Sequence, residues 1–310
     1  MRRILIAVAA LALVAAACND QSSTVTGATT SATGTTTSSA PPATAADCAT
    51  TAGFKEAGRL TIGTDSPAYP PYFSGGETKE HDFKFNDPYN GKGFESATAY
   101  EVAARMGLTP DQVDWTLAPF NQTYKPGATN YDFAIEQISY SAKRAEAVDF
   151  SESYYDVNQA LVAVEDTPIT SAASIADLAN YTLAAPIGTT SYDYIVATIA
   201  PSKEPGAYNT LADTVAAINA GQVDGIVVDL PTALFLADPF VQEVKHSVVF
   251  GQFATAAAGE YFGMTAEKGS TVIPCVNLAL QEMKADGTLA AITQEWLSEK
   301  TNVGEVPTLG

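Results

Sequence analysis

The sequence predicts an α/β protein with largely parallel sheets, divided into two lobes. A chain of 310 residues is longer than one compact hydrophobic core usually spans. From Leu60 onward, short β-rich runs alternate with helical patterns, which is typical of α/β architecture. Apolar residues make up 46% of the chain and charged residues only 16%, so there is ample material for packed cores.

Each expected element has a local signal. The first strand is expected at Leu60–Thr64, and Ala99, Val102 and Met106 recur at helical spacing before a stop at Gly107. Ser174 with Asp177, and Thr210 with Asp213, have the spacing of helix-capping pairs. A helical region interrupted at Gly287 is expected near the C-terminus. Further strands are expected at residues 113–117, 133–139, 161–164, 182–186 and 223–228.

The charge balance excludes one class of function. With 16 basic and 35 acidic residues, the formal net charge is −19, and such a field repels the phosphate backbone of nucleic acids. Three cysteines and two histidines are too few for a multi-ligand zinc site or a dithiol redox centre. We therefore expect no nucleic-acid partner and no cofactor.

The N-terminus predicts export. Arg2 and Arg3 precede an apolar run that ends in Ala15-Ala16-Ala17-Cys18, so residues 1–18 read as a signal peptide. Its end resembles a bacterial lipobox, in which Cys18 would be diacylated and hold the protein on the outer face of the cell membrane. The alternative is an ordinary signal peptide with a chance cysteine. Residues 19–46 are almost wholly Ser, Thr, Ala and Gly, which predicts a disordered tether.

The two remaining cysteines predict a disulfide. Cys48 opens the folded region, and Cys275 opens a C-terminal helix. Outside the cytoplasm such a pair is normally oxidised, and closing so long a loop would stabilise the fold by about 4 kcal/mol. Two unpaired buried thiols are the alternative.

Polar residues that could bind a ligand follow four predicted strands. Asp65, the Ser139-to-Arg144 segment, Gly188–Ser191 and Asp229 all lie at carboxyl ends, the edge at which open α/β sheets bind ligands. Arg144, three residues after the helix-capping Ser141, could bind a carboxylate.

The complementary charge is also present. Gly188-Thr189-Thr190 could meet the same anion, while Asp229 and Asp65 could accept an ammonium group. Tyr69, Phe73 and Phe120 could cover an apolar portion. Together these groups describe a receptor for a zwitterion. Each also has a structural interpretation: a solvated arginine, an aspartate that caps a turn, or aromatic residues that pack on the core.

Longer motifs add a family resemblance. These are Leu60-Thr-Ile-Gly-Thr-Asp65, Tyr69-Pro70-Pro71, Gly93-Phe94-Glu95, Ser139-Tyr-Ser141-Ala-Lys-Arg144 with Val148-Asp149-Phe150-Ser151, Gly188-Thr189-Thr190, and Gly221-Gln222-Val223-Asp224 continuing to Asp229. From about Gly58 to Leu297 the chain resembles extracellular solute-binding proteins of family 3, the polar amino-acid receptors of ABC importers.

The resemblance implies a two-lobed periplasmic-binding-protein-like fold with two crossing hinge strands. Residues 47–154 plus 252–300 would form lobe 1, and residues 155–251 would form lobe 2. Arg144 would bind the α-carboxylate, Asp229 the α-ammonium, and Tyr69 and Phe120 would sandwich the side chain. The full set of expected ligand-binding residues is Asp65, Tyr69, Phe73, Phe120, Asn121, Gln137, Ser139, Ser141, Arg144, Gly188, Thr189, Thr190 and Asp229.

Departures from the family pattern leave the ligand's identity open. Gln137 occupies a frequent Gly position, and residues 74–90 enlarge the loop after the aromatic segment. Glu95 and Glu136 either favour a cationic side chain or face solvent.

The resemblance also implies a mechanism and partners. The protein would be a monomeric, lipid-anchored and non-enzymatic component of an importer, closing on an amino acid and presenting it to a permease and ATPase. Two alternatives remain open. One is an exported cyclohexadienyl-dehydratase-like enzyme, for which Glu136 is a conceivable acid. The other is a ligand-sensing module for a signalling partner.

Overall fold

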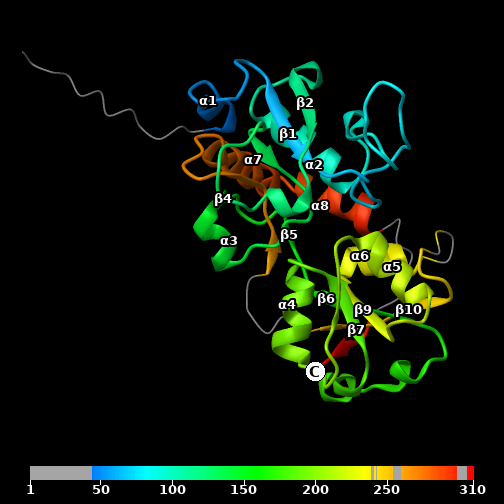
Figure 1. The fold of residues 1–310 in the computed structure, drawn as a ribbon. Helices are drawn as coiled ribbons and strands as arrows, with labels where there is room; N and C mark the ends of the chain where they lie inside the picture. Colours follow the sequence, from blue (N-terminus) through cyan, green and yellow to red (C-terminus); the bar gives the residue numbers. More distant parts are fainter. Residues whose placement is uncertain (1–43, 239–240, 242, 254–259, 299–305) are drawn as a thin grey trace, which may run out of the picture. The chain divides into compact units, whose positions relative to one another are not determined.

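Two chain crossings join the two main sheets of the protein (Figure 1). In this computed structural model, the chain leaves the first sheet after β4 (Val148–Phe150) and passes through β5 (Tyr155–Asp156) into the second. It returns through β11 (Tyr261–Phe262), which pairs antiparallel with β5. The expected two-lobed α/β fold with two hinge strands is therefore confirmed.

The structure describes residues 44–238, 241, 243–253, 260–298 and 306–310, all within the unit formed by residues 42–310. The predicted signal segment, Cys18 and the tether up to residue 43 lie outside the described residues. α1 (Ala45–Ala49) begins two residues inside the predicted tether, capped by Thr44. None of the helices in the described part of the chain combines the length and the apolar composition of a membrane span.

The first sheet has the order β2-β1-β3-β12-β4. β1 runs parallel to β2 and β3, whereas the returning strand β12 is antiparallel to β3 and β4. Its core is continuous with the buried faces of the helices around it. Its remaining strands and its helices are β1 (Leu60–Thr64), β2 (Val113–Leu117), β3 (Phe133–Ala134), β12 (Thr265–Glu267), α2 (Phe94–Arg105), α3 (Ala142–Ala147), α7 (Ile273–Ala285) and α8 (Thr288–Thr293).

The second sheet has the order β13-β10-β6-β9-β7-β8. Alternate residues of β6 enter two separate hydrophobic clusters, one on each face, which explains its continuous apolar sequence. The C-terminal strand β13 pairs with β10 and was not expected. The elements are β6 (Gln159–Val164), β7 (Leu183–Pro186), β8 (Gly206–Tyr208), β9 (Gly225–Asp229), β10 (Ser247–Phe253), β13 (Thr308–Leu309), α4 (Thr190–Tyr194), α5 (Leu211–Asn219) and α6 (Leu230–Leu236).

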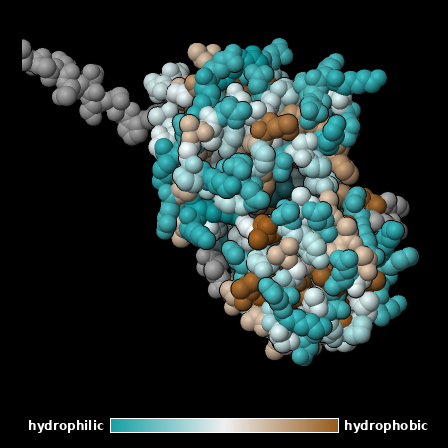
Figure 2. Space-filling view, in the orientation of Figure 1, coloured by the Kyte–Doolittle hydropathy of each residue, from teal (hydrophilic) through white to brown (hydrophobic). Residues whose placement is uncertain are grey.

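Short helical turns connect these elements, and Ser174 caps one of them as its spacing predicted. Most of the face drawn in Figure 2 is hydrophilic, and its hydrophobic residues are scattered, as expected for a strongly acidic chain. The 3₁₀ turns are Pro88–Asn90, Pro110–Gln112, Phe120–Gln122, Pro168–Ser171 and Ile175–Asn180, and the π turns are Ile195–Ile199 and Gln294–Ser298.

One predicted strand is much shorter in the structure. Residues 133–139 were expected to form a strand, but β3 ends at Ala134. Gln137 has a φ of +50°, a left-handed conformation that extended pairing does not accept. Ser139 returns to a single β-bridge with Phe262. The interruption places Glu136 and Gln137 in a loop at the end of the sheet.

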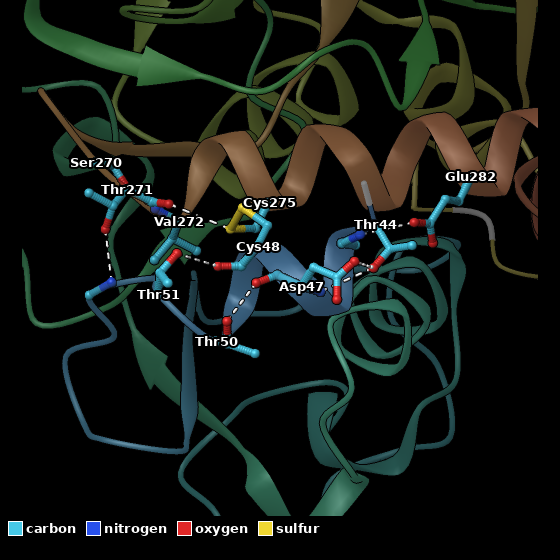
Figure 3. Close-up of a disulfide and its surroundings, with 12 residues drawn as sticks. Thr44, Asp47, Cys48, Thr50, Thr51, Ser270, Thr271, Val272, Cys275 and Glu282 are labelled. Carbon is cyan, nitrogen blue, oxygen red and sulfur yellow. Dashed lines mark hydrogen bonds between the residues drawn. A yellow bond between two sulfur atoms is a disulfide. The ribbon is translucent and has the colours of Figure 1, made fainter. Parts of the chain in front are cut away.

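The predicted disulfide is confirmed. Cys48 of α1 is bonded to Cys275 of α7 across a sequence separation of 227 residues (Figure 3). The amide of Ala45 also donates to the Glu282 carboxylate, and the amide of Gly53 donates to the Thr271 hydroxyl. The start of the folded chain is therefore attached to α7 along the length of that helix.

Candidate functional site

Side chains from both sheets line one cavity of about 450 Å³, a volume typical of small-molecule sites. Asp65 follows β1, Phe120 follows β2, and the Glu136–Ser139 segment follows β3. From the second sheet, Thr189 follows β7 and Asp229 ends β9. The cavity thus lies at the carboxyl ends of parallel strands, the edge that the sequence singled out.

Arg144 is positioned by its own helix and by the loop of the other sheet. Ser141 caps α3, and its hydroxyl accepts from the Arg144 amide at 3.2 Å. The guanidinium donates to the Ser139 carbonyl at 2.7 Å and to the Gly188 carbonyl at 2.8 Å. It also lies 4.2 Å from the centre of the Tyr124 ring, a cation–π distance.

Arg144 forms no ion pair with any residue that the structure describes. The side chain is only 8% exposed. Burial lowers its pKa from the ordinary value, although arginine remains protonated in proteins. A buried guanidinium that faces a cavity is a receptor for an anion.

Asp229 carries the opposite charge into the same cavity. It caps α6, accepting from the Thr232 amide at 2.9 Å and the Thr232 hydroxyl at 2.8 Å. The Tyr72 hydroxyl, from the loop after β1, donates to it at 2.5 Å. Burial raises the pKa of Asp229, and these hydrogen bonds oppose the rise. The donors thereby stabilise an anionic carboxylate that can receive an ammonium group.

The aromatic loop that supplies Tyr72 is fixed by a close backbone approach. Gly93 has a φ of +101°, and a Cβ at that position would lie 2.4 Å from the Tyr72 carbonyl oxygen. Only glycine fits there, because a side chain would meet rigid backbone. In the same loop, Phe73 lines the cavity, and Tyr69 lies with its ring 6.4 Å from that of Phe235 in α6.

Glu95 lies beneath the cavity rather than in it. It is fully buried at the start of α2 and accepts from the Gln137 amide at 2.7 Å, from the Gln137 side chain and from the Tyr154 hydroxyl. The alternative that Glu95 faces solvent is therefore wrong. It orients Gln137, which does line the cavity.

The protonation of Glu95 predicts a pH-dependent stability. Burial raises its pKa from 4.5 to about 7, with the three hydrogen bonds opposing the rise. The folded state therefore holds a proton that the unfolded state releases between these values, so stability falls as pH rises through this window. We expect the free energy of unfolding to decrease by about 3 kcal/mol between pH 4.5 and 7.5 through this group.

Urea denaturation at several pH values measures this change. Burial also raises the pKa of Glu136 and Asp229, so these carboxyls act in the same direction. The exposed Asp286 offers a comparison group, since its pKa is lowered to about 2 and it does not titrate in this window. An unfolding free energy that is constant or rises from pH 4.5 to 7.5 would contradict the assignment.

The structure places nearly all the predicted ligand-binding residues on the cavity wall. Ser141 and Gly188 are the exceptions, because Ser141 caps the helix of Arg144 and the Gly188 carbonyl accepts from its guanidinium. Contact of the others with a ligand stays a prediction. Those on the wall are Asp65, Tyr69, Phe73, Phe120, Asn121, Gln137, Ser139, Arg144, Thr189, Thr190 and Asp229.

Three residues that contribute to the site, Tyr72, Tyr124 and Gln159, were not predicted from the sequence. Tyr124 stacks on Arg144, and its hydroxyl donates to the Asn121 side chain at 2.5 Å. Gln159 lines the cavity and accepts from the Ser191 hydroxyl at 2.6 Å. The sequence could have indicated Gln159, because it is a polar residue at the start of an otherwise apolar strand. It could not have indicated Tyr72 or Tyr124, because their partners lie far away in the sequence or on a different element.

A cavity between two lobes, with a basic side chain from one lobe and an acidic side chain from the other, is the arrangement of a solute-binding protein. The chain belongs to the bacterial extracellular solute-binding proteins of family 3, whose model matches residues 60–299. No cluster of metal-ligating side chains occurs in the part of the chain that the structure describes.

Relatives and solved structures agree with this membership. The chain is 31% identical over 261 residues to the L-cystine-binding protein TcyA of Bacillus subtilis, covering 82% of this chain and 87% of the relative. It is 27% identical over 254 residues to the L-cystine-binding protein TcyJ of Escherichia coli K12, covering 78% and 84%. An ancestral arginine-binding protein bound to arginine matches with a TM-score of 0.61 and 24% identity, covering 78% of this chain and 99% of that one. The structural match establishes the fold.

Proposed function

We propose that the protein captures a free amino acid, or a close derivative, as the solute-binding component of an ABC importer. One observation carries the proposal: Arg144 and Asp229 line the same cavity, and Arg144 has no ion-pair partner among the described residues. Leaving a buried charge unpaired is costly, and the α-carboxylate of a ligand would supply the missing counter-charge. The α-ammonium group of the same ligand would bind Asp229.

Closure of the two lobes would complete the site. We take residues 47–154 plus 252–300 as one lobe and 155–251 as the other, although Gln252 and Phe253 still belong to β10 of the second sheet. The Tyr72–Asp229 and Arg144–Gly188 hydrogen bonds join them. A ligand held by Arg144 from one lobe and by Asp229 from the other would stabilise the closed arrangement, since its contacts depend on closure. The closed form is the state that a permease would recognise.

Relatives support the ligand class and the cellular context. The proteins named above are described as L-cystine-binding, and a further relative is the ABC transporter glutamine-binding protein GlnH of Bacillus subtilis, 25% identical over 169 residues. We extend this to the present chain as an exported, monomeric receptor anchored through diacylated Cys18. A permease and an ATPase would be its partners.

Isothermal titration calorimetry of the purified full-length protein against the common amino acids and L-cystine tests the proposal. We expect one-to-one binding of at least one of them, with no binding of its methyl ester, which lacks the carboxylate. Native mass spectrometry of the protein as purified provides a second readout, through a co-purifying small molecule. The absence of amino-acid binding in both measurements would end the proposal.

Glu136 favours one alternative function. It lines the cavity, and burial raises its pKa well above the usual range, as a general acid for a dehydratase requires. Incubating the protein with a cyclohexadienyl precursor of an aromatic amino acid and following the ultraviolet absorbance of an aromatic product tests this enzyme. If the unmodified protein forms the product and Glu136→Gln does not, the dehydratase function is supported over the receptor function.

A further inference from the structure

We propose that Asp65 and Glu136 form a subsite for a second cationic group on the ligand, so that the cavity selects an amino acid with a positively charged side chain. The inference rests on the proposed function, because it takes Arg144 and Asp229 as the partners of the α-carboxylate and α-ammonium groups.

The charges on the cavity wall are unequal. Among the residues that the structure describes, four charged side chains line it: Asp65, Glu136 and Asp229 are acidic, and Arg144 is basic. The backbone groups of one amino acid match Arg144 and Asp229 and leave the acidic pair unpaired. With a neutral ligand side chain, Glu136 keeps its proton beside Asp65, whereas a cationic side chain can displace that proton and neutralise both carboxylates.

Glu136 is the strongest single indication of a ligand group. Its side chain is only 6% exposed, and its Oε2 atom is buried with no donor among the described residues. A hydrogen bond with the Asp65 carboxyl contributes to the raised pKa of Glu136, so the two carboxyls lie together. Buried carboxylate oxygens are rarely left without a donor. Because Glu136 lines the cavity, a donor from the ligand can reach it.

Asp65 lies within hydrogen-bonding reach of Glu136 and forms the second half of the subsite. Its Oδ1 accepts from the Ser66 amide at 2.8 Å, and its Oδ2 accepts from the Phe120 amide at 3.2 Å. These donors fix its position at the end of β1. Each oxygen keeps a further lone pair with which to accept from a cation.

The groups that face Glu136 make the subsite sensitive to pH. Burial raises the pKa of Glu136 well above its usual range, and the carboxylates of Asp65 and Glu95 raise it further. Tyr124 and Tyr131 also face it, and both are neutral near pH 7, with their pKa values raised by burial. A cation that enters must displace the proton of Glu136, so affinity for a cationic ligand is expected to increase with pH.

The charged side chains on the cavity wall also disfavour L-cystine, the ligand named for the two relatives. L-cystine would bring a second carboxylate together with its second ammonium group. Arg144 is the basic residue on the described cavity wall, and it would already bind the first carboxylate. A side chain with a cation and no anion matches the wall better.

Calorimetry with L-arginine and L-citrulline isolates the charge, because the two amino acids have nearly the same shape and citrulline is neutral. We expect L-arginine to bind at least about tenfold more tightly than L-citrulline at pH 8. Glu136→Gln should reduce this ratio at least about fivefold and weaken the increase of arginine affinity with pH. Glu146→Gln is the matched control, since Glu146 is exposed on α3 and does not line the cavity.

The outcomes separate the two proposals. Equal or tighter binding of L-citrulline, tighter binding of L-cystine, or an unchanged ratio in Glu136→Gln would overturn the cationic subsite and leave the amino-acid receptor intact. A complete lack of amino-acid binding would overturn both. Thermal denaturation of each variant identifies loss of fold, and in that case Asp65→Asn provides the second test of the same ratio.

Discussion

Replacing Arg144 by alanine lowers the affinity for the amino-acid ligand by about 3–4 kcal/mol, or about 100- to 1,000-fold. The reason is that the ligand's carboxylate, once desolvated in the closed cavity, would lose its charged partner. Calorimetry on the variant and the unmodified protein measures the loss. This is the largest effect on binding that we expect from one substitution.

Two controls separate recognition of the carboxylate from loss of local structure. Arg144 also donates to the Ser139 and Gly188 carbonyls, so removing it frees two acceptors. Arg144→Lys keeps the charge but not the planar fork, and we expect an intermediate loss of about tenfold or more. The decarboxylated amine of the same ligand should bind the unmodified protein weakly and lose little further affinity in Arg144→Ala. A large additional loss for the amine would mean that Arg144 acts on structure and not on the carboxylate.

Removing the Cys48–Cys275 disulfide lowers the free energy of unfolding by about 4–5 kcal/mol. The bond closes a loop of more than two hundred residues, and opening it restores that entropy to the unfolded chain. The double variant Cys48→Ala and Cys275→Ala, compared by urea denaturation, measures the change. A midpoint within experimental error of the parent protein would contradict the prediction.

The design has to isolate this pair from the third cysteine. Both proteins should carry Cys18→Ser, so that neither mispairing nor acylation contributes. A reducing agent provides the internal control: it should destabilise the parent protein and leave the double variant unchanged. We expect the affinity for the ligand to be retained in the double variant, since neither cysteine lines the cavity.

Local sequence predicted the site to the extent that its residues lie next to strand ends. Asp65, Arg144 and Asp229 each belong to a strand, cap or turn signal that is only a few residues long, so their placement on one edge followed from α/β topology. The same reasoning failed for Glu95, whose burial depends on Gln137 and Tyr154, which are 42 and 59 residues away. It also failed for Gln137 as a strand residue, because Gln137 has a left-handed backbone and its amide donates to Glu95 instead of to a neighbouring strand.

The sequence by itself determined the alternation of strands and helices, the acidic character, the pairing of the two cysteines and the residues that cap each strand end. Only the tertiary structure decided which carboxyl groups are buried and which retain partners. Glu95 is satisfied by three donors, whereas Glu136 keeps an oxygen to which no described residue donates. The physical reason is that desolvation and hydrogen bonding are set by neighbours brought together from distant segments. Hydrophobic periodicity and capping, in contrast, act within one or two turns of the chain.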